Sequence, residues 1–141
     1  MAPDHAFEAD TLDAARAALH GHVGPVLLAA PDVPGLDARL AEAALGDLAA
    51  GCDVVVGVAH DARPYLIAIP DIESELAELV QGSFGGGLLT GFSERGLTLG
   101  MVRHERRLAS AADARALAID PVAPADLAGF LRERLPGLRD R

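Results

Sequence analysis

Lysine is absent from this sequence of 141 residues, so all 12 of its basic residues are arginine. This absence excludes a Schiff-base lysine, a lysine general base and the lysine of a phosphate-binding P-loop. Tryptophan is also absent and aromatic residues make up only 4% of the chain, so the core must consist mainly of small and branched aliphatic side chains. The single cysteine, Cys52, excludes a disulfide within the chain, and we interpret it as structural.

Acidic residues outnumber basic ones by 21 to 12, which gives a net charge of −9. Such a charge repels a phosphate backbone, and few aromatic side chains can stack on bases, so we expect no general nucleic-acid binding. A local site for a nucleotide stays compatible with this composition. The sequence has no apolar run of about 18 residues that could span a membrane. Residues 1–10 lack the pattern of a signal peptide. We therefore expect a soluble cytoplasmic protein with no membrane partner.

Helical patterns alternate with short apolar runs along the chain. Apolar spacings of three and four predict helices at 10–19, 37–50, 70–80, 88–95 and 124–135, with a further Ala-rich helix within 103–120. Apolar runs without alternation predict strands buried on both faces at 25–30, 53–58, 65–69 and 97–102. The sequence therefore predicts one α/β domain over residues 1–141 with a mainly parallel sheet. Ligands bind such folds beyond the carboxyl ends of the strands.

Three aspartates lie in loops that follow predicted strands or introduce a helix: Asp32, Asp61 and Asp120. Carboxylates at neighbouring strand ends could converge and hold a hard cation such as Mg²⁺ or Mn²⁺, which prefers oxygen ligands. The alternative is that Asp32 and Asp61 only shape turns beside proline and accept hydrogen bonds from backbone amides. The spacing alone leaves both interpretations open.

Further candidates for chemistry lie in two other places. His60 adjoins Asp61 in a predicted strand-end loop, where a titrating group could act as an acid or a base, although it could equally be a merely exposed histidine. The arginines at 103, 106 and 107 form the densest positive cluster of an acidic chain. Arginine forks match phosphate geometry, so this cluster could bind a diphosphate. Pairing of these arginines with Glu105 and other surface acids is the alternative.

A glycine-rich stretch lies at 82–87. It follows a predicted helix rather than a strand, and its spacing is not that of a dinucleotide-binding fingerprint. We interpret it as a flexible loop or a lid.

Three motifs, taken in order, resemble a known family. A predicted apolar strand ends in PDVP at 31–34, where the family has Ser-Asp-x-Pro. The segment GVAHDARPYLI at 57–67 stands where the family has Gly-Pro-Ala-x-Asp-Gly-Gly-Tyr-Tyr-Leu-Ile. The segment DPVAPADL at 120–127 stands where it has Asp-Val-Asp-Thr-Pro-Glu-Asp-Leu. Over residues 11–135 the chain thus resembles the glycosyltransferase-A-type family of radical-SAM/selenodomain-associated transferases, which are relatives of certain nucleotidyltransferases.

This resemblance implies a Rossmann-like three-layer sandwich of the nucleotide-diphospho-sugar transferase type, with Asp32 at the position of the metal-binding aspartate. Departures from the family pattern are also present. Only about ten residues precede the first predicted helix, so the first βα unit with its nucleotide-binding loop would be lacking. The family's two glycines and first tyrosine are replaced by Ala62, Arg63 and Pro64, and an expected second aspartate is Val122.

Three hypotheses follow. The first is a truncated, degenerate transferase-like domain in which catalysis is reduced or lost and which acts as a binding or assembly partner. The second is an active metal-dependent glycosyltransferase or nucleotidyltransferase. In it Asp32 and Asp120 would hold Mg²⁺ or Mn²⁺, Asp61 and His60 would be catalytic, and the arginine cluster would bind the nucleotide or nucleotide sugar. The third is an interaction module that forms a homodimer through an exposed sheet edge.

Overall fold

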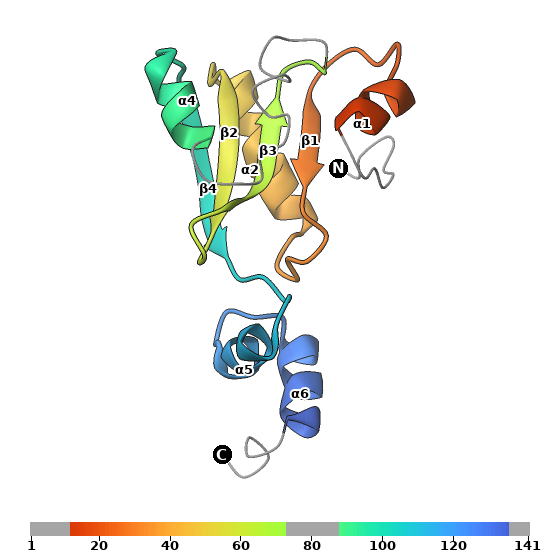
Figure 1. Cartoon of the computed structure of the whole chain (residues 1–141), viewed down its shortest axis with the longest axis vertical. Coiled ribbons are helices and arrows are strands. Elements are labelled where there is room, and N and C mark those ends of the chain that lie inside the picture. Colours follow the sequence, from red (N-terminus) through yellow and green to blue (C-terminus); the bar gives the residue numbers. More distant parts are fainter. Residues whose placement is uncertain (1–11, 73–87, 136–141) are drawn as a thin grey trace.

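The computed structural model describes residues 12–72 and 88–135 (Figure 1). The helices are α1 (Leu12–Ala18), α2 (Ala38–Ala49), α4 (Leu88–Glu94), α5 (Ala111–Ile119) and α6 (Ala125–Arg134). The strands are β1 (Val26–Ala29), β2 (Val54–Ala59), β3 (Pro64–Ile69) and β4 (Leu99–Glu105).

Each of these helices and strands lies where the sequence predicts an element of its type, and β4 continues three residues beyond its predicted end. Most of the predicted helix at 70–80 and the glycine-rich stretch at 82–87 lie outside the described residues. Within the described part of the chain, no helix is long and apolar enough to cross a membrane.

Among the described residues, the sheet has four strands in the order β1-β3-β2-β4 and is mixed, so the prediction of a mainly parallel sheet is wrong. Strand β3 runs antiparallel to both β1 and β2, whereas β2 and β4 pair in parallel. Residues 60–63 join β2 to β3, which is too short a connection for the crossover that parallel strands require. An apolar run without alternation indicates that a strand is buried on both faces. It does not indicate whether the strand runs parallel or antiparallel to its neighbours.

Helices cover both faces of this sheet, which explains why its central strands lack alternation. On one face, Leu40 and Ala44 of α2 pack against Val55, Tyr65 and other side chains of β2 and β3. On the other face, Phe92 of α4 packs against a cluster that includes Val54, Val56, Ile67 and Ile69. Every residue of β2 and β3 is buried as a result.

Helix α2 begins at a capping residue. The Asp37 side chain accepts a hydrogen bond from the Leu40 backbone N–H at 2.9 Å, which satisfies one of the free amides of the first turn. This bond lowers the pKa of Asp37 below its ordinary value. The cap fixes the residue at which the chain leaves the loop after β1 and enters the helix.

Helices α5 and α6 form a hairpin beyond the end of the sheet (Figure 1). They pack on each other through a small apolar cluster centred on Leu117, Ala118 and Leu131. Helix α5 is capped by Ser110, whose hydroxyl accepts from the Asp113 N–H, while the Asp113 carboxylate accepts from the Ala109 N–H. This reciprocal cap fixes the path of the chain between the end of β4 and the hairpin.

Tyr65 is the only tyrosine of the chain, and its side chain is fully buried at 0% exposure. Its hydroxyl donates a hydrogen bond to the Arg103 carbonyl oxygen at 2.6 Å. Burial, followed by the charge of Glu105, raises the pKa of Tyr65 from 10.0 to about 12. The phenol therefore stays protonated and keeps this bond over the whole neutral range.

We expect Tyr65 to ionise with a midpoint near pH 12 in the folded protein and near its ordinary value of 10.0 in denaturant. Because the pKa is raised on folding, the stabilisation from the neutral phenol is complete below pH 10 and declines between about pH 10 and 12. The ultraviolet absorbance of phenolate measures this titration without interference, since the chain has no tryptophan. A native midpoint near 10 would contradict the burial of this side chain.

Candidate site around Arg107

The candidate site lies where the loops after β1, β2 and β4 meet (Figure 1). Both β1 and β2 pair antiparallel with β3, and β4 pairs in parallel with β2, so β1, β2 and β4 all end at the same edge of the sheet. The Leu108 N–H donates to the Asp32 carbonyl oxygen at 2.6 Å and ties the segment after β4 to the loop after β1. This is the edge at which α/β folds bind ligands.

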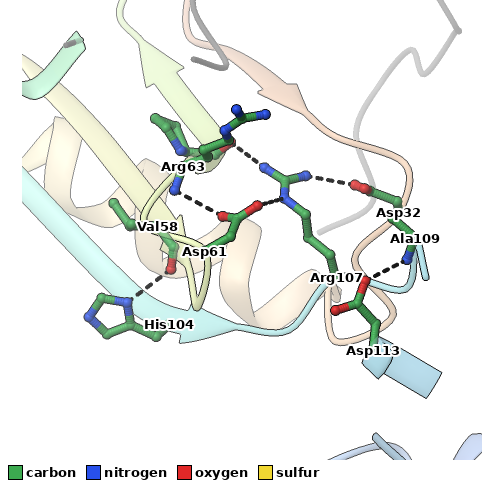
Figure 2. Close-up of polar contacts among 9 residues, drawn as sticks. Asp32, Val58, Asp61, Arg63, His104, Arg107, Ala109 and Asp113 are labelled. Carbon is green, nitrogen blue, oxygen red and sulfur yellow. Dashed lines mark hydrogen bonds and ion pairs between the residues drawn. The ribbon is translucent and has the colours of Figure 1, made fainter. Parts of the chain in front are cut away.

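Arg107 occupies the centre of this edge (Figure 2). Its guanidinium donates through Nη1 to Asp32 Oδ1 at 2.8 Å and through Nε to Asp61 Oδ2 at 3.0 Å. Through Nη2 it also donates to the Pro64 carbonyl oxygen at 2.8 Å. Its side chain is only 15% exposed. One arginine thus joins three strand-end segments, and the trio with Asp32 and Asp61 carries a net charge of −1.

Asp61 has a second role in the turn between β2 and β3. Its Oδ1 accepts from the Arg63 N–H at 2.9 Å, while Ala62 adopts a φ of 66° in the left-handed region. A side chain that bonds the backbone two residues later is a common device of tight turns. Asp61 therefore shapes its turn, as one of the two sequence interpretations has it, and its other carboxylate oxygen faces the same guanidinium as Asp32.

Asp120 lies beside a different arginine. Arg106 donates through Nε to Asp120 Oδ2 at 2.7 Å, and the Val122 N–H donates to Asp120 Oδ1 at 3.0 Å. The backbone bond from Val122, and next the bond from Arg106, lower the pKa of Asp120. The Val122 side chain is 87% exposed to solvent. This ion pair holds the α5–α6 hairpin to the segment that follows β4.

Arg103, the third arginine of the predicted cluster, lies on β4 and is also paired. It contacts the Glu105 carboxylate through Nε and donates through Nη2 to the Gly35 carbonyl oxygen at 2.9 Å. Its Nη2 lies 3.4 Å from Asp37 Oδ2. The bond to Glu105 raises the pKa of Arg103. Each of the three arginines of the predicted cluster is therefore paired with a carboxylate of its own chain, as the alternative interpretation has it.

His60 is exposed at the start of the turn after β2. Its ring centroid lies 6.3 Å from that of His104, whose Nδ1 lies 3.0 Å from the Val58 carbonyl oxygen. The charge of His60 is also among the smaller causes that lower the pKa of Asp120. His60 thus lies near the Arg106–Asp120 pair, and it is exposed to solvent.

The described residues do not supply a cation site of the expected kind. Among residues 12–72 and 88–135, no group of three or more His, Cys, Asp or Glu is arranged so that it could hold a metal ion. Hard divalent cations need several oxygen ligands. Asp32 and Asp120, the predicted metal ligands, each have an oxygen bonded to an arginine, and those arginines differ.

The sequence left open whether the three arginines bind phosphate or pair with acids of the chain, and in the structure they pair with acids. What the sequence did not indicate are the backbone acceptors, which are the Pro64 carbonyl oxygen for Arg107 and the Gly35 carbonyl oxygen for Arg103. The composition did favour the pairing with acids. Because the chain has nine more acidic than basic residues, a cluster of arginines will more often lie beside carboxylates of the same chain than remain unpaired.

The fold is similar to that of a solved structure from Desulfovibrio desulfuricans G20, described as a "putative nucleotide-diphospho-sugar transferase". The two chains superpose with a TM-score of 0.67 at 20% sequence identity. The match covers 86% of this chain and 56% of that chain, so this chain spans little more than half of that protein's length. Neither the protein-family models nor the curated protein sequences contain a match. At this identity the likeness shows the fold alone.

Proposed function

We propose that this chain is a binding or assembly protein built on the nucleotide-diphospho-sugar transferase fold, in which nucleotide-sugar catalysis is reduced or lost. The observation that carries this proposal is the position of Arg107, which is bonded to both Asp32 and Asp61. These are the two carboxylates that converge at the carboxyl edge of the sheet. The Arg107 guanidinium lies between them and occupies the position that a divalent cation would need.

Charge balance supports the same conclusion. The group of Arg107, Asp32 and Asp61 has a net charge of −1, and the Arg106–Asp120 pair is neutral. Arg103 faces both Glu105 and Asp37. A diphosphate approaching these arginines would have to displace carboxylates, and it would meet excess negative charge while doing so. The arginine pairs join loops to one another and to the α5–α6 hairpin.

Calorimetric titration of the protein with Mn²⁺, with nucleoside diphosphates and with nucleotide sugars tests this function. We expect no saturable binding of a nucleotide in the micromolar range, with or without Mn²⁺, because the cation ligands are held by arginines. Micromolar binding that depends on Mn²⁺ would overturn the proposal. It would favour the alternative of an active metal-dependent glycosyltransferase or nucleotidyltransferase in which Asp32 holds the ion. The replacement Asp32→Asn would then be expected to abolish that binding.

A further inference from the structure

An open hollow of about 280 Å³ lies between α2 and β4. Strand β4 forms the edge of the sheet opposite to β1, so the hollow lies at that edge. Strand β4 is an edge strand, since it pairs only with β2 within the sheet of the described residues. Alternate backbone N–H and C=O groups of an edge strand point outward and can pair with another strand. The hollow therefore combines an unpaired strand edge with the flank of a helix.

Three residues of α2 that line this hollow are spaced four apart: Arg39, Ala43 and Asp47. Residues at this spacing lie along one side of a helix. Arg39 and Asp47 thus lie about 6 Å before and after Ala43 along the helix axis, from the rise of about 1.5 Å per residue. Arg39 and Ala43 are exposed, and Asp47 is partly buried. The flank has a positive end, a small apolar centre and a negative end.

Strand β4 runs alongside this flank. A Cβ atom added to Gly100, near the start of the strand, would lie 3.1 Å from Asp47 Oδ2, so the start of β4 lies beside the negative end of the flank. Arg103, near the other end of β4, lines the same hollow together with Arg39, but its charge is paired with Glu105 and Asp37, so Arg39 supplies the positive end. Between Gly100 and Arg103 is Met101, a large apolar side chain that is 51% exposed.

We propose that this face binds a second copy of the same chain across a two-fold axis that passes near Ala43 and Met101. Strand β4 would pair antiparallel with β4 of the second copy and extend the mixed sheet. The two α2 helices would then run antiparallel over the junction, with Ala43 facing Ala43. Arg39 of each copy would meet Asp47 of the other, because the two charges lie at equal distances on either side of the centre.

The order of charges on α2 is the reason to choose a second copy as the occupant. A two-fold axis brings the same surface of both subunits together, so a patch must be complementary to itself. A flank that is positive at one end and negative at the other meets this condition, whereas a flank of one sign would repel its copy. The opposite edge strand, β1, contains only apolar residues and offers no such pair. The inference goes beyond the proposed function and does not depend on the Arg107 site.

Charge reversal tests this dimer. Sedimentation velocity would be measured on the full chain over a micromolar concentration range at about 0.15 M salt, where a Debye length of about 8 Å screens the repulsion between two acidic chains. We expect the parent protein to dimerise. We expect Arg39→Asp and Asp47→Arg each to weaken dimerisation about tenfold or more, because each places like charges opposite one another. The variant that combines Arg39→Asp with Asp47→Arg should recover the parent affinity to within about threefold, because it exchanges the two charges and again places opposite charges across the interface.

A matched control is Asp126→Arg, which makes the same charge change on α6, in the hairpin away from the sheet (Figure 1). It should leave dimerisation unchanged. Far-ultraviolet circular dichroism of every variant would establish that it is folded. A monomeric parent protein would overturn the inference. So would a dimer that neither single reversal weakens, or one that the double variant does not restore.

Discussion

Replacing Gly57 with alanine should destabilise the protein by about 1–3 kcal/mol, towards the upper end of that range, because the added methyl group has no space. A Cβ atom at this position of β2 would lie 2.6 Å from Cζ and 2.8 Å from Oη of Tyr65. That ring is fully buried, and its hydroxyl is bonded to the Arg103 carbonyl oxygen, so it cannot move away without losing this bond. Urea unfolding followed by circular dichroism measures the loss.

Gly46→Ala is the matched control, since it adds the same methyl group within α2, where no atom lies within 4 Å of the added Cβ. Alanine is the better helix former, so this variant should be more stable than the parent by about 0.5–1 kcal/mol. Combining Gly57→Ala with Tyr65→Leu should cost less than the sum of the single changes, because the smaller side chain relieves the contact. A Gly57→Ala variant as stable as the parent would contradict the packing of Tyr65 against β2.

Replacing Arg107 with methionine should lower the free energy of unfolding by about 1–3 kcal/mol, since hydrogen bonds to charged groups contribute about that much. The change removes the donors to Asp32, Asp61 and the Pro64 carbonyl oxygen and leaves two like charges facing each other. Both carboxylates are partly exposed, so solvent reduces the loss below that of a fully buried pair. Thermal and urea unfolding measure it.

The same variant tests the proposed function through a second measurement. With Arg107 gone, Asp32 and Asp61 can offer two carboxylates to a cation that completes its ligands with water, so Mn²⁺ should stabilise the variant more than it stabilises the parent. Adding Asp32→Asn to Arg107→Met should remove this gain. Arg63→Met changes an exposed side chain in the same turn as Asp61 and keeps the backbone N–H that Asp61 accepts from, so it is the charge-matched control and should alter neither stability nor Mn²⁺ binding by much. Equal Mn²⁺ responses of the parent and Arg107→Met would contradict the idea that Arg107 occupies the cation position.

The helices and strands of the described residues were predictable because their signals are local. The apolar run Val54–Val58 and the capping aspartate before α2 are read within a few neighbouring residues. The direction of β3 was not read correctly, because burial on both faces gives the same pattern to parallel and antiparallel strands. The length of the connection between β2 and β3 was a better guide to direction than the apolar pattern.

By itself, the sequence determined that the chain is an α/β protein whose aspartates Asp32 and Asp61 lie at strand ends, since composition, periodicity and turn residues act over short distances. Only the tertiary structure decided what those aspartates do. Arg107 is 75 residues from Asp32 and 46 from Asp61 in sequence, and the three meet because β1, β2 and β4 end at one edge of the sheet. Ion pairing between loops that are distant in sequence depends on where the strands place them, and no local sequence pattern indicates which loops will lie side by side.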